Sequence, residues 1–213
     1  MWIHSLPAER NGSSGQSRNH EGPDFASGAS DFIVSLGGGA PDGTWRWTND
    51  VGSVWDQAGT FMHEFGHNLG LKHGGSDGYN YKPNYLSVMN YAFQFRGLTR
   101  NNSQGNFDYS RFELAGLDEN NLDEQTSLIT KTAALTDTYG TMWFCKDAQN
   151  KSFSKQTDNA TSTLDWDCNT TIVTQTVANI NAGWNDNPDT TFTLLGTQSD
   201  WDRLVYKGGA IGQ

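Results

Sequence analysis

Three histidines within eleven residues constrain this chain more than any other feature of its sequence. His63 and His67 are four residues apart, so on a helix their imidazoles lie on one face, about 6 Å apart along the axis. His73 would be turned about 240° away from His67 if the helix continued. Gly70 lies between them, and glycine readily ends a helix in the left-handed conformation. The spacing therefore predicts a helix over residues 54–69, a turn at Gly70, and a third imidazole folded back toward the first two.

These residue types at this spacing are typical of a metal site. Three neutral imidazoles leave at least one coordination position open on zinc, as in catalytic zinc sites and unlike closed structural ones. Glu64 follows His63 on the same helix, so its carboxylate can act as general base on a zinc-bound water without being a ligand. Such a site hydrolyses amides without a covalent intermediate. The alternatives are core histidines or a structural, inactive metal site, and His4 and His20 are predicted not to be ligands.

The stretch from His63 to His73 matches every fixed position of the motif H-E-x-x-H-x-x-G-x-x-H, and on these residues the chain resembles the metzincin clan of zinc metallopeptidases. Residues 87–91, Ser-Val-Met-Asn-Tyr, resemble the clan's Met-turn in its astacin and serralysin form. The resemblance implies that Met89 forms an apolar floor under the imidazoles. It also implies that Tyr91 is a displaceable metal ligand that then stabilises the tetrahedral intermediate. The alternative is that both are ordinary core residues.

The resemblance also implies how a substrate would lie. Residues 31–36, an apolar run closed by glycines, would form the sheet edge that pairs with an extended peptide. Residues 91–97 would line the pocket for the residue after the scissile bond. Phe93, Phe95 and Arg96 are candidates there, each with packing or surface exposure as the alternative.

The resemblance stops at the level of the clan. Gly74 follows the third histidine, where the named families carry other characteristic residues, so no single family is assignable. Only 62 residues precede His63, and we expect the clan's first strands and backing helix to be missing or supplied differently. The expected fold is α+β, a single catalytic domain over residues 1–213. Its upper subdomain would be residues 1–74 and its lower subdomain residues 75–213, with a cleft between them.

The composition predicts a loop-rich chain around the helix. There are 18 Asp against 6 Glu, with 19 Asn and 24 Gly, and Asp, Asn and Gly favour turns over helices. Ser53 with Asp56 three residues later predicts the start of the helix, and residues 11–22 are predicted to be loop. Further helices are expected near residues 111–117, 128–136 and 200–206.

Charge and hydropathy exclude some classes of partner. The formal net charge of −10 opposes binding to a phosphate backbone, so nucleic acid is not an expected partner. No apolar run approaches the roughly 18 residues that a membrane-spanning helix needs. Residues 1–7 are too short and too polar for a signal peptide. The expected partner is a peptide or protein substrate.

The two cysteines, Cys145 and Cys168, lack the close spacing of a zinc ribbon or a redox pair. A disulfide between them would close a loop of 24 residues and stabilise the fold by about 3 kcal/mol. Such a bond would indicate an oxidising compartment, and we therefore expect a secreted protein. The alternative is two unpaired buried thiols.

A second metal, calcium, is one interpretation of an acidic loop late in the chain. Oxygen-bearing side chains alternate there, at Asp165, Asp167 and Asn169, with Asn179, Asn181 and Asp186 available to complete a shell. The usual glycine of an EF-hand-type loop is replaced by Thr170, however, and the final glutamate by Thr176. The alternative is a turn rich in Asp and Asn that Cys168 fastens.

The zinc motif and the Met-turn together predict a secreted zinc endopeptidase in which Glu64 activates the attacking water. Two other functions stay open. One is a catalytically inactive binding module stabilised by zinc, and the other is a narrow protease acting on one glycoprotein or on its own precursor.

Overall fold

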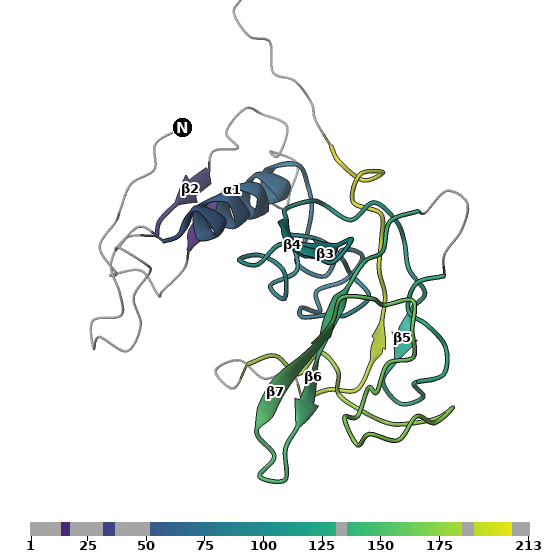
Figure 1. Ribbon diagram of the computed structural model, residues 1–213. Coiled ribbons are helices and arrows are strands. Elements are labelled where there is room, and N and C mark those ends of the chain that lie inside the picture. The colour runs from purple at the N-terminus through teal and green to yellow at the C-terminus, as the bar shows by residue number, and fades with distance from the viewer. Residues whose placement is uncertain (1–13, 18–31, 37–51, 131–135, 185–189, 206–213) are drawn as a thin grey trace, which may run out of the picture.

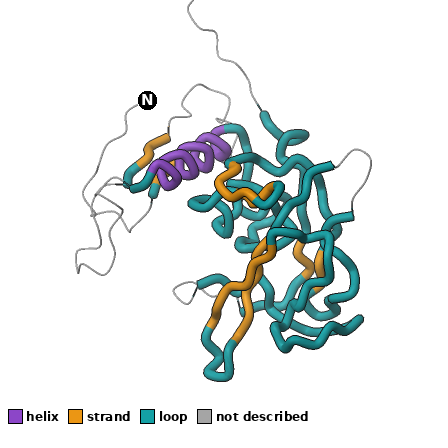
Figure 2. Tube along the Cα trace, in the orientation of Figure 1, coloured by secondary structure: helices purple, strands orange, loops and turns teal. Residues whose placement is uncertain are grey.

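The computed structural model describes residues 14–17, 32–36, 52–130, 136–184 and 190–205. Over these residues the chain forms one α-helix and eight short strands, which pair into four two-stranded antiparallel sheets (Figures 1 and 2). This mixture is α+β, as the sequence predicts. The elements are α1 (Val54–Asn68), β1 (Gly15–Ser17), β2 (Phe32–Val34), β3 (Leu98–Arg100), β4 (Ser103–Asn106), β5 (Leu117–Asp118), β6 (Thr141–Lys146), β7 (Ser152–Thr157) and β8 (Leu194–Leu195).

The helix α1 begins and ends where the sequence signals predict. The Ser53 hydroxyl accepts the Asp56 N–H at 3.2 Å, and the Asp56 carboxylate accepts the Ser53 N–H at 2.8 Å, which completes a capping box. Asn68 is the last helical residue, and Gly70 follows with a φ of +89°. This left-handed conformation suits a residue without a Cβ atom. The helix predicted over residues 54–69 is confirmed to within one residue.

A small sheet of β1 and β2 lies against α1 (Figure 1). β2 lies within the strand predicted over residues 31–36, and the Phe32 ring packs 5.3 Å from Phe61 and 6.2 Å from Phe65 of the helix. Its partner β1 lies inside residues 11–22, so the loop prediction is wrong for that part. The pairing with β2, rather than local propensity, makes this Gly-Gln-Ser segment a strand.

The rest of the described chain has little regular structure. The longest strands, β6 and β7, form a hairpin of six residue pairs, while β3 pairs with β4 and β5 with β8. The larger hydrophobic core lies in this part and includes Trp143, Phe144 and Trp166. A smaller core joins the end of α1 to Val88 and Met89.

A disulfide joins Cys145 of β6 to Cys168, as one of the two interpretations of the cysteines predicts. The Cα atoms of the pair are 6.1 Å apart, and Cys145 is buried in the larger core. The bond fastens the segment after Trp166 to the hairpin. Among the described residues, no helix has the length and hydropathy needed to cross a membrane.

The C-terminal helix predicted over residues 200–206 is wrong for the described part of that segment. The chain makes one turn there, closed by a 2.8 Å bond from the Arg203 N–H to the Asp200 carbonyl. The Val205 N–H then donates to the Leu69 carbonyl at 2.9 Å and does not continue a helix. The Val205 N–H, which would bond within the helix if the helix continued, therefore bonds to the end of α1 instead. Residue 206 lies outside the described residues.

The two short helices predicted in the middle of the chain are not found in the described residues. Residues 111–116 are not helical, and residue 117 begins β5. Residues 128–130 are not helical either, and residues 131–135 lie outside the described residues. The N–H groups of Leu114 and Ile129 donate to residues 197 and 160, far along the chain. Tertiary hydrogen bonds therefore override the local preference.

Candidate metal centre

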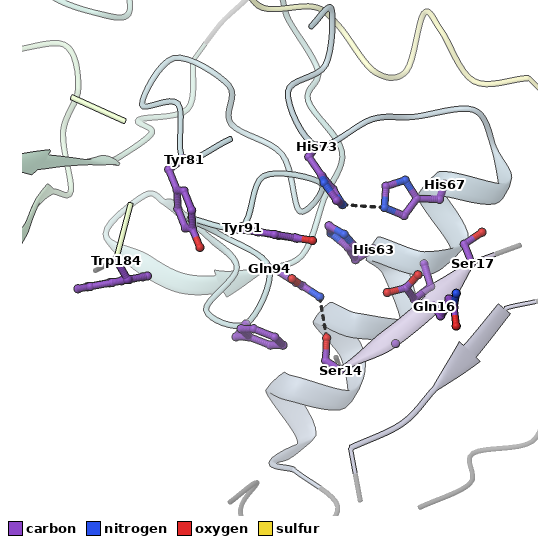
Figure 3. Close-up of a pocket in the computed structure, with 13 residues that line it drawn as sticks. Ser14, Gln16, Ser17, His63, His67, His73, Tyr81, Tyr91, Gln94 and Trp184 are labelled. Atoms are coloured by element: carbon purple, nitrogen blue, oxygen red, sulfur yellow. Dashed lines mark hydrogen bonds between the residues drawn. The ribbon is translucent and has the colours of Figure 1, made fainter. Parts of the chain in front are cut away.

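The end of α1 and the turn after it bring three imidazoles together (Figure 3). His63 and His67 lie on one face of the helix, with ring centroids 4.8 Å apart. The chain reverses at Gly70, where the Leu71 N–H bonds back to a helix carbonyl at 3.0 Å. This reversal places the His73 ring 4.9 Å and 4.7 Å from the other two. One nitrogen of each ring lies within 4.8 Å of the others, so the predicted arrangement of helix, turn and third imidazole is confirmed.

Backbone carbonyls orient two of the imidazoles. Nδ1 of His63 lies 3.0 Å from the Val88 carbonyl oxygen, and Nδ1 of His67 lies 2.9 Å from that of Leu71. Because a carbonyl only accepts, each Nδ1 carries the proton and each Nε2 keeps its lone pair. Burial, followed by the charges of His73 and His67, holds the pKa of His63 well below its usual range. A neutral imidazole whose Nε2 keeps its lone pair is the form that binds a transition metal.

The three imidazoles are close enough to share one metal ion. Nε2 of His67 and Nε2 of His73 are 2.9 Å apart. Two nitrogens on one tetrahedral zinc, each about 2.0–2.1 Å from it, are roughly 3.3 Å apart. A small increase in the distance between the His67 and His73 nitrogens would therefore accommodate such an ion. Three protein donors would leave at least one position of a four-coordinate ion for water or substrate.

Glu64 is buried beside the imidazoles, at the edge of β1. Burial raises the pKa of Glu64 to about 7, and a hydrogen bond from the Ser17 N–H opposes this shift. The Ser17 hydroxyl also bonds to Asn68, so β1 is fastened along the helix. Residues of β1 line the cavity over the site, and no described residue of β2 does. The strand that borders the site is therefore β1, and not the strand predicted over residues 31–36.

Met89 packs against the helix that carries the histidines. Its side chain is fully buried in the smaller core, and a Cβ atom on Gly66 would lie only 2.3 Å from its Sδ. Only a glycine at position 66 allows this approach. Sequence reasoning missed Gly66. Glycine costs about 1 kcal/mol relative to alanine inside a helix, so its presence there is a signal that could have identified this position. The neighbouring Val88 carbonyl bonds to His63, so the Met89 segment also orients a ligand.

Tyr91 lies at the open side of the imidazoles. Its ring centroid is 5.4 Å from that of His63 and 4.4 Å from that of His73, and Figure 3 shows its hydroxyl directed toward the histidines. Burial, followed by the charge of Glu64 and the influence of Tyr81, raises the pKa of Tyr91 to about 12. The phenol is therefore neutral near pH 7 and can donate a hydrogen bond.

A cavity of about 470 Å³ lies over the imidazoles. Of the residues 91–97 that the resemblance implies for the pocket, Tyr91, Gln94 and Phe95 line it. Phe93 is buried in the larger core, and Arg96 reaches away to Gln156. Sequence reasoning missed several lining residues because they come from the β1 segment or from distant segments: Ser14, Gln16, Ser17, Tyr81 and Trp184.

A buried carboxylate supports the segment under the helix. Asp200 accepts hydrogen bonds from the Tyr85 hydroxyl at 2.7 Å, the Ser87 hydroxyl at 2.5 Å and the Ser110 N–H at 3.0 Å. The Ser87 oxygen in turn accepts the Met89 N–H at 3.1 Å. Asp200 therefore fixes the turn that carries Met89. The sequence predicts only that Asp200 begins a helix over residues 200–206, and no local pattern indicates this long-range role.

The acidic loop brings Asp165 and Asp167 close to Glu124, which sequence reasoning missed. Asp167 accepts both the N–H and the side-chain amide of Asn169, at 3.0 Å and 2.8 Å, and Asp165 accepts the Thr170 N–H at 3.1 Å. These are the bonds of a turn rich in Asp and Asn, the alternative interpretation of this loop. Calcium binding there stays a prediction.

The remaining residues weighed as metal ligands either donate hydrogen bonds to backbone carbonyls or lie outside the described residues. The amide groups of Asn179 and Asn181 donate to the carbonyls of residues 191 and 80. Asp186, His4 and His20 lie outside the described residues.

No protein-family model, curated protein or solved structure matches this chain. The functional conclusion is therefore drawn from the chain's own residues.

Proposed function

We propose that this chain is a zinc-dependent endopeptidase that hydrolyses extended protein substrates. The observation that carries the proposal is the convergence of His63, His67 and His73 beside a buried glutamate, under a cavity of about 470 Å³. Oriented imidazoles are suited to zinc, and the cavity has room for substrate side chains.

His63, His67 and His73 would hold the ion through their Nε2 atoms, while the Val88 and Leu71 carbonyls keep the first two rings in orientation. When bound, zinc supplies Lewis-acid chemistry, polarising a carbonyl and lowering the pKa of water.

Glu64 is the proposed general base. A carboxyl group with a pKa near 7 is matched to taking up and releasing a proton at neutral pH. Water adds its oxygen to the scissile carbonyl carbon while Glu64 accepts one of its protons. Glu64 then passes that proton to the amide nitrogen as the C–N bond breaks, which leaves a carboxylic acid and an amine.

Tyr91 is the proposed donor to the oxygen that becomes negative during the attack. Its neutral hydroxyl faces the histidines, so it can donate where negative charge develops (Figure 3). Tyr91→Phe should lower kcat by about 100-fold, the usual cost of removing one such donor, with zinc content unchanged. An unchanged kcat would contradict this role and leave Tyr91 as a wall residue.

The decisive experiment measures zinc content and proteolysis in parallel. The purified chain should bind one zinc per molecule and cleave casein. Glu64→Gln should keep the zinc and lose at least about 100-fold in rate, because the base is removed. His67→Ala should lose both zinc and activity, and the exposed Glu113→Gln is the matched control that should change neither. Cleavage by Glu64→Gln at the parental rate, or a chain without zinc, would refute the proposal.

The same assay separates the other two functions. A folded, zinc-loaded chain that cleaves no member of a broad peptide library would be a binding module stabilised by the metal. Cleavage of one protein but not of casein or the library would indicate a narrow protease.

We also propose that the protein is secreted, because disulfides such as Cys145–Cys168 persist in oxidising compartments. Alkylation of the native protein before any reductant is added should leave both cysteines unlabelled. Labelling of either thiol would contradict this.

A further inference from the structure

One wall of the cavity is aromatic. Tyr81, Tyr91, Phe95 and Trp184, here called the aromatic wall, line it together with the imidazoles. Figure 3 shows Tyr81 and Trp184 on the side of the cavity away from Ser17 of β1. Trp184 remains 47% exposed although it lines the cavity, so much of its ring surface is available to a ligand.

The two tyrosines of the aromatic wall are held by one asparagine. Tyr81 has a φ of +57°, in the left-handed region that bulky residues rarely adopt. The Asn80 side-chain oxygen accepts the N–H of Tyr81 and the N–H of Tyr91, each at 2.9 Å. A strained backbone persists where its surroundings fix it, and such positions cluster at functional sites. Glycine would suit this backbone better, so the presence of a tyrosine points to a role for its ring.

Phe144 of β6 gives the aromatic wall a rigid backing. This fully buried ring lies 5.4 Å from Tyr81 and 4.9 Å from Trp184, edge to face with both. Its N–H donates to the Ile180 carbonyl at 2.9 Å, and the next residue, Cys145, is held by the disulfide. The aromatic wall is therefore preorganised, which reduces the entropy lost when a ligand binds.

The charges around the cavity favour ring contacts over ion pairs. Among the described residues that line it, Glu64 is the only carboxylate and none is lysine or arginine. Glu64 lies beside β1, so the aromatic wall itself offers no charged group to a cationic or anionic side chain. Flat aromatic side chains gain both apolar burial and edge-to-face contacts on such a surface.

We propose that the aromatic wall is a subsite for an aromatic side chain of the substrate. The inference rests on the proposed function in that the substrate is taken to be a peptide. Tyr81 and Trp184 are its specificity-determining residues, because they come from outside the zinc motif and the Met-turn.

The test measures binding without cleavage, on zinc-loaded Glu64→Gln by calorimetry. The probes are decapeptides of one common sequence in which Phe, Ala or Arg is placed at each position in turn. At one position the Phe peptide should bind about tenfold more tightly than the Ala peptide, the order of one ring contact. Adding Trp184→Ala should abolish this preference. Adding Trp201→Ala, which removes an equally exposed indole that does not line the cavity, should preserve it.

A second variant keeps the test informative if Trp184→Ala misfolds. Tyr81→Gly removes the ring and relieves the left-handed backbone, so it should fold and still lose most of the preference. Tighter binding of Arg than of Phe at every position, or a Phe preference that survives both variants, would overturn the proposal.

Failure of the subsite and failure of the protease give different results. If the parent chain cleaves peptides with no preference for Phe at any position, the aromatic subsite is refuted and the protease stands. If Phe peptides bind in a Trp184-dependent manner but none is cleaved, the subsite stands and the protease is refuted. If no peptide binds and none is cleaved, both are refuted.

Discussion

Two regions of the molecule hold the cavity by different means. The helix region comprises α1, β1 and β2, and the loop region comprises residues 75–205 as far as they are described. In α1 the hydrogen-bond ladder fixes the backbone from which every side chain projects, and Ser53 and Gly70 set its two ends. The described loop region has no α-helix and no strand longer than six residues. Outside its short strand pairs, its side chains must therefore be positioned without a repeating ladder.

Between the strand pairs of the loop region, buried carboxylates take the place of a ladder. Glu124 is fully buried and accepts three backbone N–H groups, among them those of Trp166 at 2.7 Å and Val173 at 3.1 Å. Glu119 and Asp200 are likewise buried acceptors of backbone N–H groups. One side chain thus satisfies several donors that would otherwise be unpaired. Stability is therefore spread along the helix region and concentrated in a few residues of the loop region.

The largest effect is expected from Glu124→Ala. Three N–H groups lose their acceptor, so the free energy of unfolding should fall by about 4 kcal/mol. Urea denaturation followed by tryptophan fluorescence measures this. Glu113→Ala is the matched control in the same region, because this carboxylate is exposed, and it should change stability by less than about 0.5 kcal/mol. Equal losses of unfolding free energy in Glu124→Ala and Glu113→Ala would contradict the conclusion that buried carboxylates hold the loop region.

The disulfide should have the next largest effect. Replacing Cys145 and Cys168 together by alanine should lower the free energy of unfolding by about 3 kcal/mol, because the loop they close is no longer constrained in the unfolded chain. Reductant should destabilise the parent by a similar amount and leave the double variant unchanged. A double variant as stable as the oxidised parent would show that the buried carboxylates alone hold the loop region.

The helix region is the part that could be predicted from the sequence. His63, His67 and Gly70 follow the periodicity of one helix and its end, so local rules place them without any knowledge of the rest of the chain. Glu64 and the capping box are found by the same rules. The pairing of Cys145 with Cys168 could be predicted because few alternatives existed.

The loop region and the aromatic wall could not be predicted in this way. Glu124 and Asp200 act on residues tens of positions away, and no local pattern records such bonds. Tyr81 and Trp184 each pack against the distant Phe144, and β1 pairs with β2 against its local propensity. The helix predicted over residues 200–206 is wrong for the same reason, since the N–H groups of Asp200, Trp201 and Val205 donate to remote carbonyls.

A smaller effect is expected at the contact between the two regions. Gly66→Ala favours the helix by about 1 kcal/mol but brings a Cβ atom to 2.3 Å from Met89 Sδ. Overpacking should dominate and lower the free energy of unfolding by about 2 kcal/mol. Zinc affinity should fall as well, because Val88, next to Met89, orients His63. Gly78→Ala, where an added Cβ meets nothing within 4 Å, is the control and should change neither. A stabilised Gly66→Ala chain would mean that the regions are not tightly packed at Met89.

The smallest effect is expected within the helix region, from Ser53→Ala. The substitution removes the acceptor of the Asp56 N–H and should lower the free energy of unfolding by about 1 kcal/mol, with zinc content unchanged. Ser53→Gly is the matched control, because glycine leaves the first N–H groups accessible to water and should cost only a few tenths of that. A loss with Ser53→Ala as large as with Glu124→Ala would mean that the helix region also depends on single residues. The difference between a ladder and a few buried acceptors would then not explain how the two regions hold the cavity.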